Sequence, residues 1–297
     1  MQKWKVIITD GLSEKGQAIL RDDTDVKDLT GISAKDLLEM VNDCDALIVR
    51  GRTKVTAAIL EAGPNIKVVG RAGVGVDNID LAAAQSRGVT VVNSPIATTI
   101  AVAEHTLALM LSLVRHITPA DASMKSGLWN KKKLAGIELN GKILGIIGMG
   151  HIGSGVAQRA AIFGTTILGY DPFLDEASIH KRGAQPVKLN DLLARSDLIS
   201  LHIPLTPESR GMINGQTIGL MKRGTYLICA ARGGVIDETA LLNALESGQI
   251  AGAALDVFNT EPPGLTALVA HPNVVATPHI GAQTAEAQVR AAVDISE

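Results

Sequence analysis

Three glycines in the middle of the chain have the spacing that most directly implies chemistry. Gly148, Gly150 and Gly153 follow a short apolar run with the pattern Gly-x-Gly-x-x-Gly. The first two glycines allow a sharp turn and a close approach of the backbone to a pyrophosphate, and the third lets the next helix pack on the strand. The N–H groups that begin that helix can hold phosphates. The pattern therefore predicts a dinucleotide-binding turn.

An acidic residue, Asp171, ends the next apolar run at 166–170. A carboxylate at the end of the second strand can accept hydrogen bonds from both ribose hydroxyls and would repel a 2′-phosphate, which predicts NAD rather than NADP. The alternative interpretation is a tight structural turn with a solvated aspartate.

Further polar segments follow predicted strands in the same half of the chain, where ligands bind in open α/β sheets. These segments are Cys229–Asp237, 254–263 and 276–282. They contain Arg232, Asp256, Glu261 and His279. Singly, a loop arginine is usually solvated, a glutamate before proline usually caps a turn, and a histidine after proline is usually structural.

The combined motifs resemble the D-isomer-specific 2-hydroxyacid dehydrogenases over nearly the whole chain. The resemblance rests on the glycine turn, the three segments above, and residues 93–95 and 102–104. Segments 71–80 and 252–258 look most like the members of the family that act on 3-phospho-D-glycerate. The resemblance implies that Arg232, Glu261 and His279 are catalytic.

These residue types suit the oxidation of a secondary alcohol. His279 can take the hydroxyl proton because imidazole titrates near neutrality, a role that typically contributes ~10²–10⁴-fold. Glu261, bonded to the other ring nitrogen, would fix the tautomer. Arg232 offers a planar fork to a substrate carboxylate.

The resemblance also implies a set of residues that contact NAD. Besides the three glycines and Asp171, they are His151, Ile152, His202, Ile203, Ala230, Ala231, Asp256 and Gly281. His151 stands where many members carry Arg, and Ile203 stands where some carry Thr. His105 is expected only to pack within a long helix or at an interface.

Two arginines at the ends of predicted strands in the N-terminal half are candidates for binding the substrate. Arg50 and Arg71 could converge on a phosphate, and the backbone N–H groups around Val74 and Gly75 could hold a carboxylate as an anion nest does. The resemblance supports both ideas. A salt bridge to a nearby aspartate is the alternative for each arginine.

Length and element order predict two domains. A chain of 297 residues exceeds what one core usually serves, and alternating strand and helix patterns imply parallel sheets. We expect an α/β fold of two Rossmann-like, doubly wound parallel-sheet domains with an active-site cleft between them. The substrate-binding domain is 1–97, with 283–297 returning to it, and the NAD-binding domain is 98–282.

The expected elements follow from apolar periodicity and breakers. Expected strands are 5–8, 46–49, 67–70, 90–93, 143–147, 166–170, 198–201, 225–230, 251–256 and 273–277. Expected helices are 14–20, 35–41, 57–61, 81–87, 98–116, 153–163, 190–195, 214–221 and 238–246, with the start of another at 284–296. The last helix has no stop signal, so we expect the natural chain to continue.

The composition limits the classes of partner, the metal content and the cellular compartment that we expect. The net charge of −2 gives no reason to expect nucleic acid or an anionic membrane. Cys44 and Cys229 show neither metal spacing nor a disulfide framework, which favours a reducing, cytoplasmic setting without a bound metal. The resemblance implies a homodimer or a higher homo-oligomer, with the helix 98–116 at the dimer interface.

The reaction that the resemblance implies is NAD-dependent oxidation of 3-phospho-D-glycerate to 3-phosphooxypyruvate, the entry to serine synthesis. A rival is a dehydrogenase of glyoxylate, hydroxypyruvate or another unphosphorylated acid. A third hypothesis, of another class, is a non-enzymatic NAD-binding co-regulator, because the same scaffold resembles certain corepressors.

Overall fold

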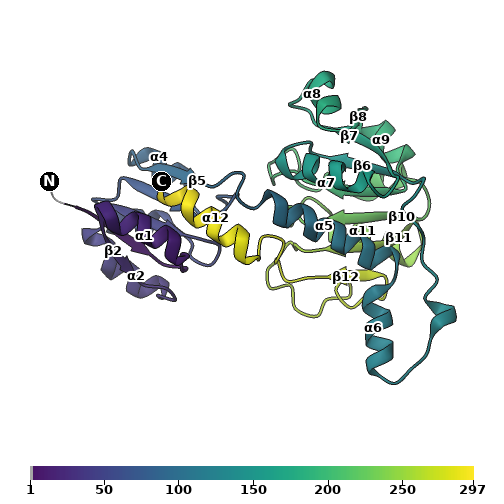
Figure 1. Ribbon diagram of the computed structural model, residues 1–297, viewed down its shortest axis with the longest axis horizontal. Coiled ribbons are helices and arrows are strands. Elements are labelled where there is room, and N and C mark those ends of the chain that lie inside the picture. Colours follow the sequence, from purple (N-terminus) through teal and green to yellow (C-terminus); the bar gives the residue numbers. More distant parts are fainter. Residues whose placement is uncertain (1–2) are drawn as a thin grey trace. The chain divides into compact units, whose positions relative to one another are not determined.

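The computed structural model describes residues 3–297 and divides them into two compact α/β units (Figure 1). The first unit runs to Thr98 and also contains Ala282–Glu297, and the second is Thr99–Gly281. Each unit is built on its own parallel sheet, which confirms the expected fold class of two parallel-sheet domains.

The first unit has a five-stranded parallel sheet with the order β2-β1-β3-β4-β5. The strands are β1 (Trp4–Ile8), β2 (Thr24–Asp28), β3 (Ala46–Val49), β4 (Val68–Arg71) and β5 (Thr90–Asn93). The helices are α1 (Glu14–Asp23), α2 (Ala34–Met40), η1 (Val41–Asp43), α3 (Ala57–Ala62), α4 (Leu81–Ser86) and α12 (Ala285–Ser296).

Alternating side chains of β1 fill two cores, one on each face of this sheet. Ile7 packs with residues of α2, α3 and α4 on one face. Val6 and Ile8 point the other way and share a cluster with Leu20 of α1 and Ile295 of α12. Successive side chains of a strand point to opposite faces, so a run of consecutive apolar residues is what a sheet covered on both faces requires.

The C-terminal helix packs on the N-terminal unit (Figure 1). Gly16 of α1 lets the two helices approach closely, because an ideal Cβ there would lie 2.7 Å from the carbonyl oxygen of Ala292. The hydroxyl of Ser94 donates to the carbonyl of Ala291 at 3.1 Å, and Arg290 Nε donates to the carbonyl of Ala97 at 2.9 Å. Residues far apart in sequence therefore complete one unit.

The second unit has a seven-stranded parallel sheet with the order β12-β11-β10-β9-β6-β7-β8. Its strands are β6 (Ile143–Ile147), β7 (Thr166–Tyr170), β8 (Gln185–Pro186), β9 (Leu198–Leu201), β10 (Thr225–Cys229), β11 (Ile250–Leu255) and β12 (Val274–Ala276). Counted within the unit, the order is that of a doubly wound dinucleotide-binding sheet with one strand added. The order reverses between β6 and β9, and ligands bind at such a switch point.

Helices cover both faces of the second sheet. They are α5 (Thr99–Val114), α6 (Ile117–Lys125), η2 (Lys131–Lys133), α7 (His151–Ala161), α8 (Glu176–Lys181), α9 (Leu189–Arg195), α10 (Gly215–Gly219) and α11 (Glu238–Glu246). Leu192, Ile218 and Leu241 of α9, α10 and α11 join the main core on one face. α5 packs beside α7 and against β10, β11 and β12 on the other.

The expected long helix at 98–116 is wrong at its C-terminal end. α5 stops at Val114, and His116 adopts a left-handed backbone with φ +53°. The chain bends by 65° there and continues as α6. Pro119 lies in the first turn of α6, where a proline costs no helix hydrogen bond, so it does not act as the breaker.

Several further elements were not expected from the sequence, namely β2, α8, the two-residue strand β8 and the 3-10 helices η1 and η2. β2 is an edge strand with polar, largely exposed residues, so it has none of the apolar signal of a buried strand. α8 is a short helix capped by Asp175, whose side chain accepts from the N–H of Ser178.

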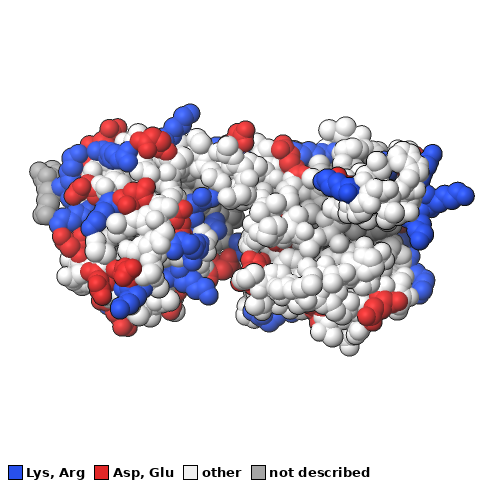
Figure 2. Space-filling view, turned by 90° about the horizontal axis from the view of Figure 1, so that it is seen from below, with Lys and Arg blue, Asp and Glu red and all other residues white. Residues whose placement is uncertain are grey.

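The surface of the first unit is mixed in charge. On the face seen in Figure 2, the unit that contains the N-terminus carries basic and acidic side chains closely interspersed, and the other unit is largely uncharged there. Within residues 3–297, no single helix has the length and apolar composition to cross a membrane, although the bent pair α5 and α6 together meets that test.

Candidate functional site

The glycine turn lies between β6 and α7, and two of its glycines are required by packing. Gly148 has φ +92°, and an ideal Cβ there would lie 2.5 Å from the carbonyl oxygen of His202. On Gly153 an ideal Cβ would lie 2.0 Å from the carbonyl oxygen of Gly148. Gly150 differs, because no heavy atom lies within 4 Å of its ideal Cβ. The turn therefore leaves open space beside the start of α7, which fits the phosphates of a dinucleotide.

Asp171 is fixed beside this turn. Its Oδ2 accepts from the N–H of Met149 at 2.9 Å, and its Oδ1 accepts from the N–H of Phe173 at 2.9 Å. Each oxygen keeps lone pairs for ribose hydroxyls, since an ionised carboxylate has about four acceptor sites. Arg182, which the sequence did not single out, donates to the carbonyl of Met149 at 2.9 Å and so also holds the turn.

His202 and Ile203 follow β9, on the other side of the switch point. His202 Nε2 lies 2.8 Å from the hydroxyl of Ser200, and burial lowers the pKa of His202 to about 4. The ring is therefore neutral near pH 7. Ile203 lies against Gly148, with its Cγ2 2.7 Å from the ideal Cβ position there. His151 and Ile152 form the first turn of α7, where His151 is exposed.

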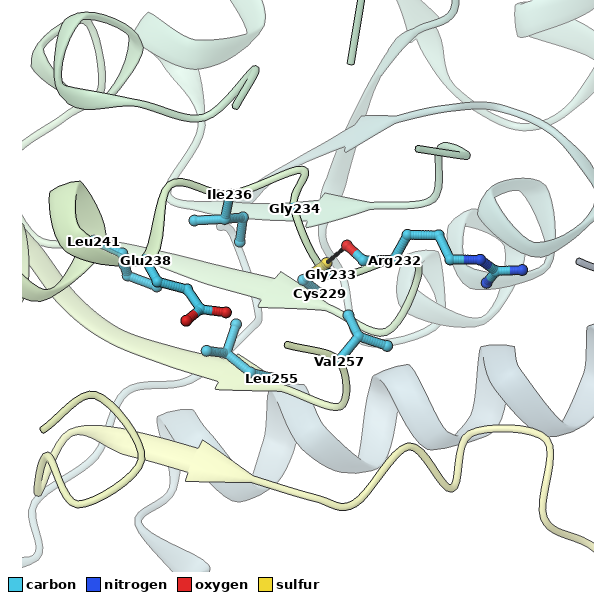
Figure 3. Close-up of a pocket in the computed structure, with 9 residues that line it drawn as sticks. All are labelled: Cys229, Arg232, Gly233, Gly234, Ile236, Glu238, Leu241, Leu255 and Val257. Carbon is cyan, nitrogen blue, oxygen red and sulfur yellow. Dashed lines mark hydrogen bonds between the residues drawn. The ribbon is translucent and has the colours of Figure 1, made fainter. Parts of the chain in front are cut away.

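Arg232 lies on the loop after β10. Its Nη1 donates to the carbonyl of Ala231 at 2.7 Å. Arg232 lines a cavity together with Cys229 and Gly233, and Figure 3 shows its guanidinium extending away from the other labelled residues. The backbone of Ala230 and Ala231 precedes it at the strand end. Burial raises the pKa of the Cys229 thiol to about 11, so this cysteine stays protonated under the loop.

The Arg232 loop packs directly on the loop that carries Glu261. An ideal Cβ on Gly233 would lie 1.8 Å from the carbonyl oxygen of Phe258, so only glycine fits there. Glu238, at the start of α11, accepts from the N–H of Asn259 at 2.6 Å. These two contacts fix the Glu261 loop against the end of β10.

Glu261 and His279 are brought together from separate strand ends. His279 Nδ1 lies 2.7 Å from Glu261 Oε2, and Glu261 Oε1 accepts from the N–H of Phe258 at 3.1 Å. The side chains of His279 and Glu261 are 50% and 37% exposed, so the far nitrogen of the imidazole is accessible to a ligand. His279 has φ +53°, a left-handed conformation that costs a non-glycine residue roughly 1–2 kcal/mol.

Asp256 is buried, with 1% exposure, and accepts hydrogen bonds from residues on both sides of His279 in the chain. Burial alone would raise its pKa, but hydrogen bonds from His105, Thr277 and the N–H groups of Ile280 and Gly281 outweigh it and hold the pKa below its usual value. The carboxylate is therefore ionised near neutral pH. No local pattern indicates that His105 belongs to this cluster, because His105 and Asp256 are far apart in the chain.

Arg50 and Arg71 lie at one edge of the first sheet. β3 and β4 are neighbours, with Val49 opposite Arg71, so Arg50 follows at the adjacent strand end. The Arg71 guanidinium lies over Gly73, with Nη1 1.7 Å from the ideal Cβ position of that glycine. The carbonyl of Val74 accepts from the amide of Asn93, and Gly75 follows it with intermediate exposure.

Comparisons with known proteins match this architecture. Residues 107–281 match the model of the D-isomer specific 2-hydroxyacid dehydrogenase, NAD binding domain. The chain belongs to this family. Membership confirms the expected family and its NAD-binding domain. Among residues 3–297, no cluster of three or more His, Cys, Asp or Glu side chains could hold a metal ion.

A similar curated relative is a D-3-phosphoglycerate dehydrogenase of Methanocaldococcus jannaschii, 47% identical over 99% of this chain and 56% of the relative. The chain thus spans just over half the length of that relative. A glyoxylate reductase from Paecilomyes thermophila has a TM-score of 0.90 at 30% identity, covering 100% of this chain and 94% of that one. A D-lactate dehydrogenase from Aquifex aeolicus, complexed with NAD and lactic acid, has a TM-score of 0.85 at 32% identity, covering 98% and 93%.

The open space at Gly150 is where an added methyl group should interfere with the cofactor. Gly150→Ala should lower the affinity for NADH by about 10-fold or more, because the new methyl group occupies the space through which a pyrophosphate approaches the backbone. The melting temperature of the Gly150→Ala protein should change little, because no neighbouring heavy atom lies within 4 Å of the ideal Cβ position. Isothermal titration with NADH, together with thermal unfolding, measures both effects.

Gly219→Ala in α10 is the matched control, since an ideal Cβ there also meets nothing within 4 Å. Equal NADH affinity in the two variants would mean that the dinucleotide does not bind at this turn.

Proposed function

We propose that this chain oxidises 3-phospho-D-glycerate to 3-phosphooxypyruvate with NAD as acceptor, the entry step of serine synthesis. The observation that carries the proposal is the 2.7 Å hydrogen bond between His279 Nδ1 and Glu261 Oε2, at the same edge of the sheet as the glycine turn. A binding module has no need of an acid–base pair. The curated relatives named D-3-phosphoglycerate dehydrogenase support the choice of substrate.

His279 is the proton acceptor of the proposed reaction. With Nδ1 bonded to Glu261, Nε2 presents its lone pair and takes the proton of the substrate hydroxyl, and the negative carboxylate stabilises the imidazolium that results. NAD bound at the glycine turn would supply the acceptor for the hydride of the carbon that carries this hydroxyl. Removal of this proton and of one hydride converts the alcohol carbon of the substrate into a carbonyl.

Arg232 orients the substrate in this proposal. Its guanidinium can hold the substrate carboxylate through two parallel hydrogen bonds, and it stabilises the charge that develops on the carbonyl oxygen in the reverse direction. The Gly233 contact with the carbonyl of Phe258 keeps the loop of Arg232 in register with that of Glu261. Both loops are thus set before a ligand arrives.

Arg50 and Arg71 are the proposed phosphate ligands. They stand at the carboxyl ends of adjacent strands, and two guanidiniums match the charge and geometry of a phosphate dianion. The backbone at Val74 and Gly75 is the proposed partner of the substrate carboxylate. A lactate or glyoxylate has no group that would use two arginines in this way.

The substrate assignment is tested by following NADH absorbance with phosphorylated and unphosphorylated 2-hydroxy acids. Arg71→Ala should lower kcat/KM for 3-phospho-D-glycerate by roughly 10–100-fold, the effect of losing a charge-assisted hydrogen bond. Activity on D-glycerate should change far less, because D-glycerate has no phosphate. Arg87→Ala, an exposed arginine of the same unit, is the matched control.

Three outcomes would count against the proposal. An equal loss on both substrates would contradict the phosphate assignment. Preference of the unaltered chain for glyoxylate or hydroxypyruvate would favour the rival reductase. NADH binding without turnover of any acid would favour a co-regulator.

We further propose that the chain forms a homodimer through α6 and the segment after it. α5 is mostly buried within its own unit, whereas α6 buries no residue there. Exposed apolar residues gather on α6 and just beyond: Ile117 (55%), Met124 (56%), Leu128 (54%) and Trp129 (78%). Such a group of apolar side chains is typical of a surface that a partner covers. A second copy is the partner that the family resemblance favours.

Sedimentation equilibrium tests this assembly. The unaltered chain should have twice the 31.0 kDa mass of one chain, and Trp129→Glu should dissociate it, because a charge in an apolar interface loses its hydration. Phe173→Glu, at an aromatic residue that is even more exposed, is the control. A single-chain mass for the unaltered protein, or equal dissociation by both variants, would contradict the dimer.

We also propose a cytoplasmic location. Cys44 and Cys229 are both buried and free of a disulfide, which supports a reducing compartment.

A further inference from the structure

The turn that carries His279 is held in a conformation that its own residues do not favour. His279 has φ +53°, and its N–H donates to the carbonyl of Thr277 at 3.1 Å. A left-handed imidazole-bearing residue persists only where the surrounding structure holds it. The neighbours of this turn must therefore stabilise its conformation.

Asp256 holds the turn from both sides. On the N-terminal side, Oδ1 accepts from the hydroxyl of Thr277 at 2.6 Å. On the C-terminal side, Oδ1 accepts from the N–H of Ile280 at 2.9 Å, and Oδ2 accepts from the N–H of Gly281 at 2.8 Å. One buried carboxylate thus accepts hydrogen bonds from residues before and after His279.

His105 completes this cluster from a different element. It projects from α5, and its Nε2 lies 3.2 Å from Asp256 Oδ1 and 3.3 Å from the hydroxyl oxygen of Thr277. Its side chain is only 17% exposed. An N–H on Nε2 can donate to both oxygens, which sets the position of the carboxylate and of the threonine together.

We propose that His105 is a positioning residue for the reaction. It holds Asp256 and Thr277 in place, and through them it keeps the His279 turn left-handed, so that Nδ1 faces Glu261 and Nε2 faces the ligand. This proposal rests on the proposed function, because positioning His279 matters only if His279 transfers a proton. It assigns a role to a residue that the sequence indicated only as packing.

The crowding at Gly281 explains why the cluster has to be held tightly. An ideal Cβ there would lie 3.1 Å from Asp256 Oδ2 and 3.6 Å from His105 Cδ2. The backbone after His279 therefore lies directly against the two side chains. A shift of Asp256 moves this backbone, and the displacement reaches the imidazole two residues earlier.

The test compares three variants. His105→Phe removes the N–H donor and keeps a ring of similar size, His105→Gln keeps a donor at similar reach, and Thr106→Val is the control. Thr106 is the next residue of α5 and is buried, but its hydroxyl donates within the helix to the carbonyl of Val102. Thr106→Val thus disturbs α5 without touching Asp256.

His105→Phe should lower kcat by about 10–100-fold, the cost expected when a catalytic group is misplaced by about 1 Å. KM for NAD and the dissociation constant for NADH should change far less than kcat, because the glycine turn and Asp171 lie elsewhere and only the expected cofactor contacts at Asp256 and Gly281 are disturbed. His105→Gln should restore most of kcat, and Thr106→Val should leave it unchanged.

A second readout uses the protein without ligands. In an NMR spectrum, the Nδ1 proton of His279, assigned by its loss in His279→Gln, should shift or broaden in His105→Phe and be retained in His105→Gln. If the chain turns over no 2-hydroxy acid, the proposed function fails, and this spectrum still decides whether His105 positions His279.

Thr277→Val replaces His105→Phe if the latter does not fold. Thr277→Val removes a hydrogen bond to the same oxygen, Asp256 Oδ1, and should give the same fall in kcat with a much smaller change in NADH affinity. The proposal is overturned if the His279 signal and kcat are unchanged in the variant that folds. It is also overturned if His105→Gln is as impaired as His105→Phe, or if NADH affinity falls as much as kcat.

Discussion

The hydrogen bond between His279 Nδ1 and Glu261 Oε2 depends on the parallel order of two strands. Glu261 lies on the loop after β11, and His279 follows β12, its hydrogen-bonded neighbour. Parallel strands end at the same edge of the sheet, so the two loops start side by side although a long segment separates them in sequence. An antiparallel pairing would put the imidazole and the carboxylate at opposite edges. The proposed proton transfer is therefore a property of the topology.

The same edge carries the cofactor turn, and its position follows from the strand order. β6 and β9 are adjacent where the winding reverses, which leaves room outside their ends. The carbonyl of His202 after β9 approaches Gly148 after β6 closely enough to exclude a Cβ. The edge thus combines a backbone fitted to phosphates with loops that carry Arg232, Glu261 and His279. Asp256, ionised and buried, stabilises the last of these loops.

Features that depend on local sequence could be predicted, and those that depend on distant contacts could not. The glycine spacing determines the turn at Gly148 through φ and close approach, so it is visible in a few residues. The strands of the second sheet are continuous apolar runs, as a doubly covered sheet requires. The bend at His116 has no such signal, because a left-handed histidine is stabilised by its surroundings. β2 was missed because an exposed edge strand needs few apolar residues.

The contact of His105 with Asp256 shows the same limit within the site. Each residue alone has an ordinary explanation, one as part of a core helix and the other as the cap of a strand. Only the packing of α5 against the strands at the end of the sheet brings them to 3.2 Å. The resemblance to a family indicated which residues touch the cofactor, but the residues that hold the catalytic turn in place emerge from the three-dimensional arrangement.

The measurement that tests the central claim most directly is a double-mutant cycle on Glu261 and His279, with single-turnover oxidation of 3-phospho-D-glycerate as readout. If the two side chains act as one unit, the variant with both Glu261→Gln and His279→Gln will be no slower than the one with His279→Gln alone. If the two effects instead multiply, the carboxylate and the imidazole act independently, and the account given for this hydrogen bond is wrong.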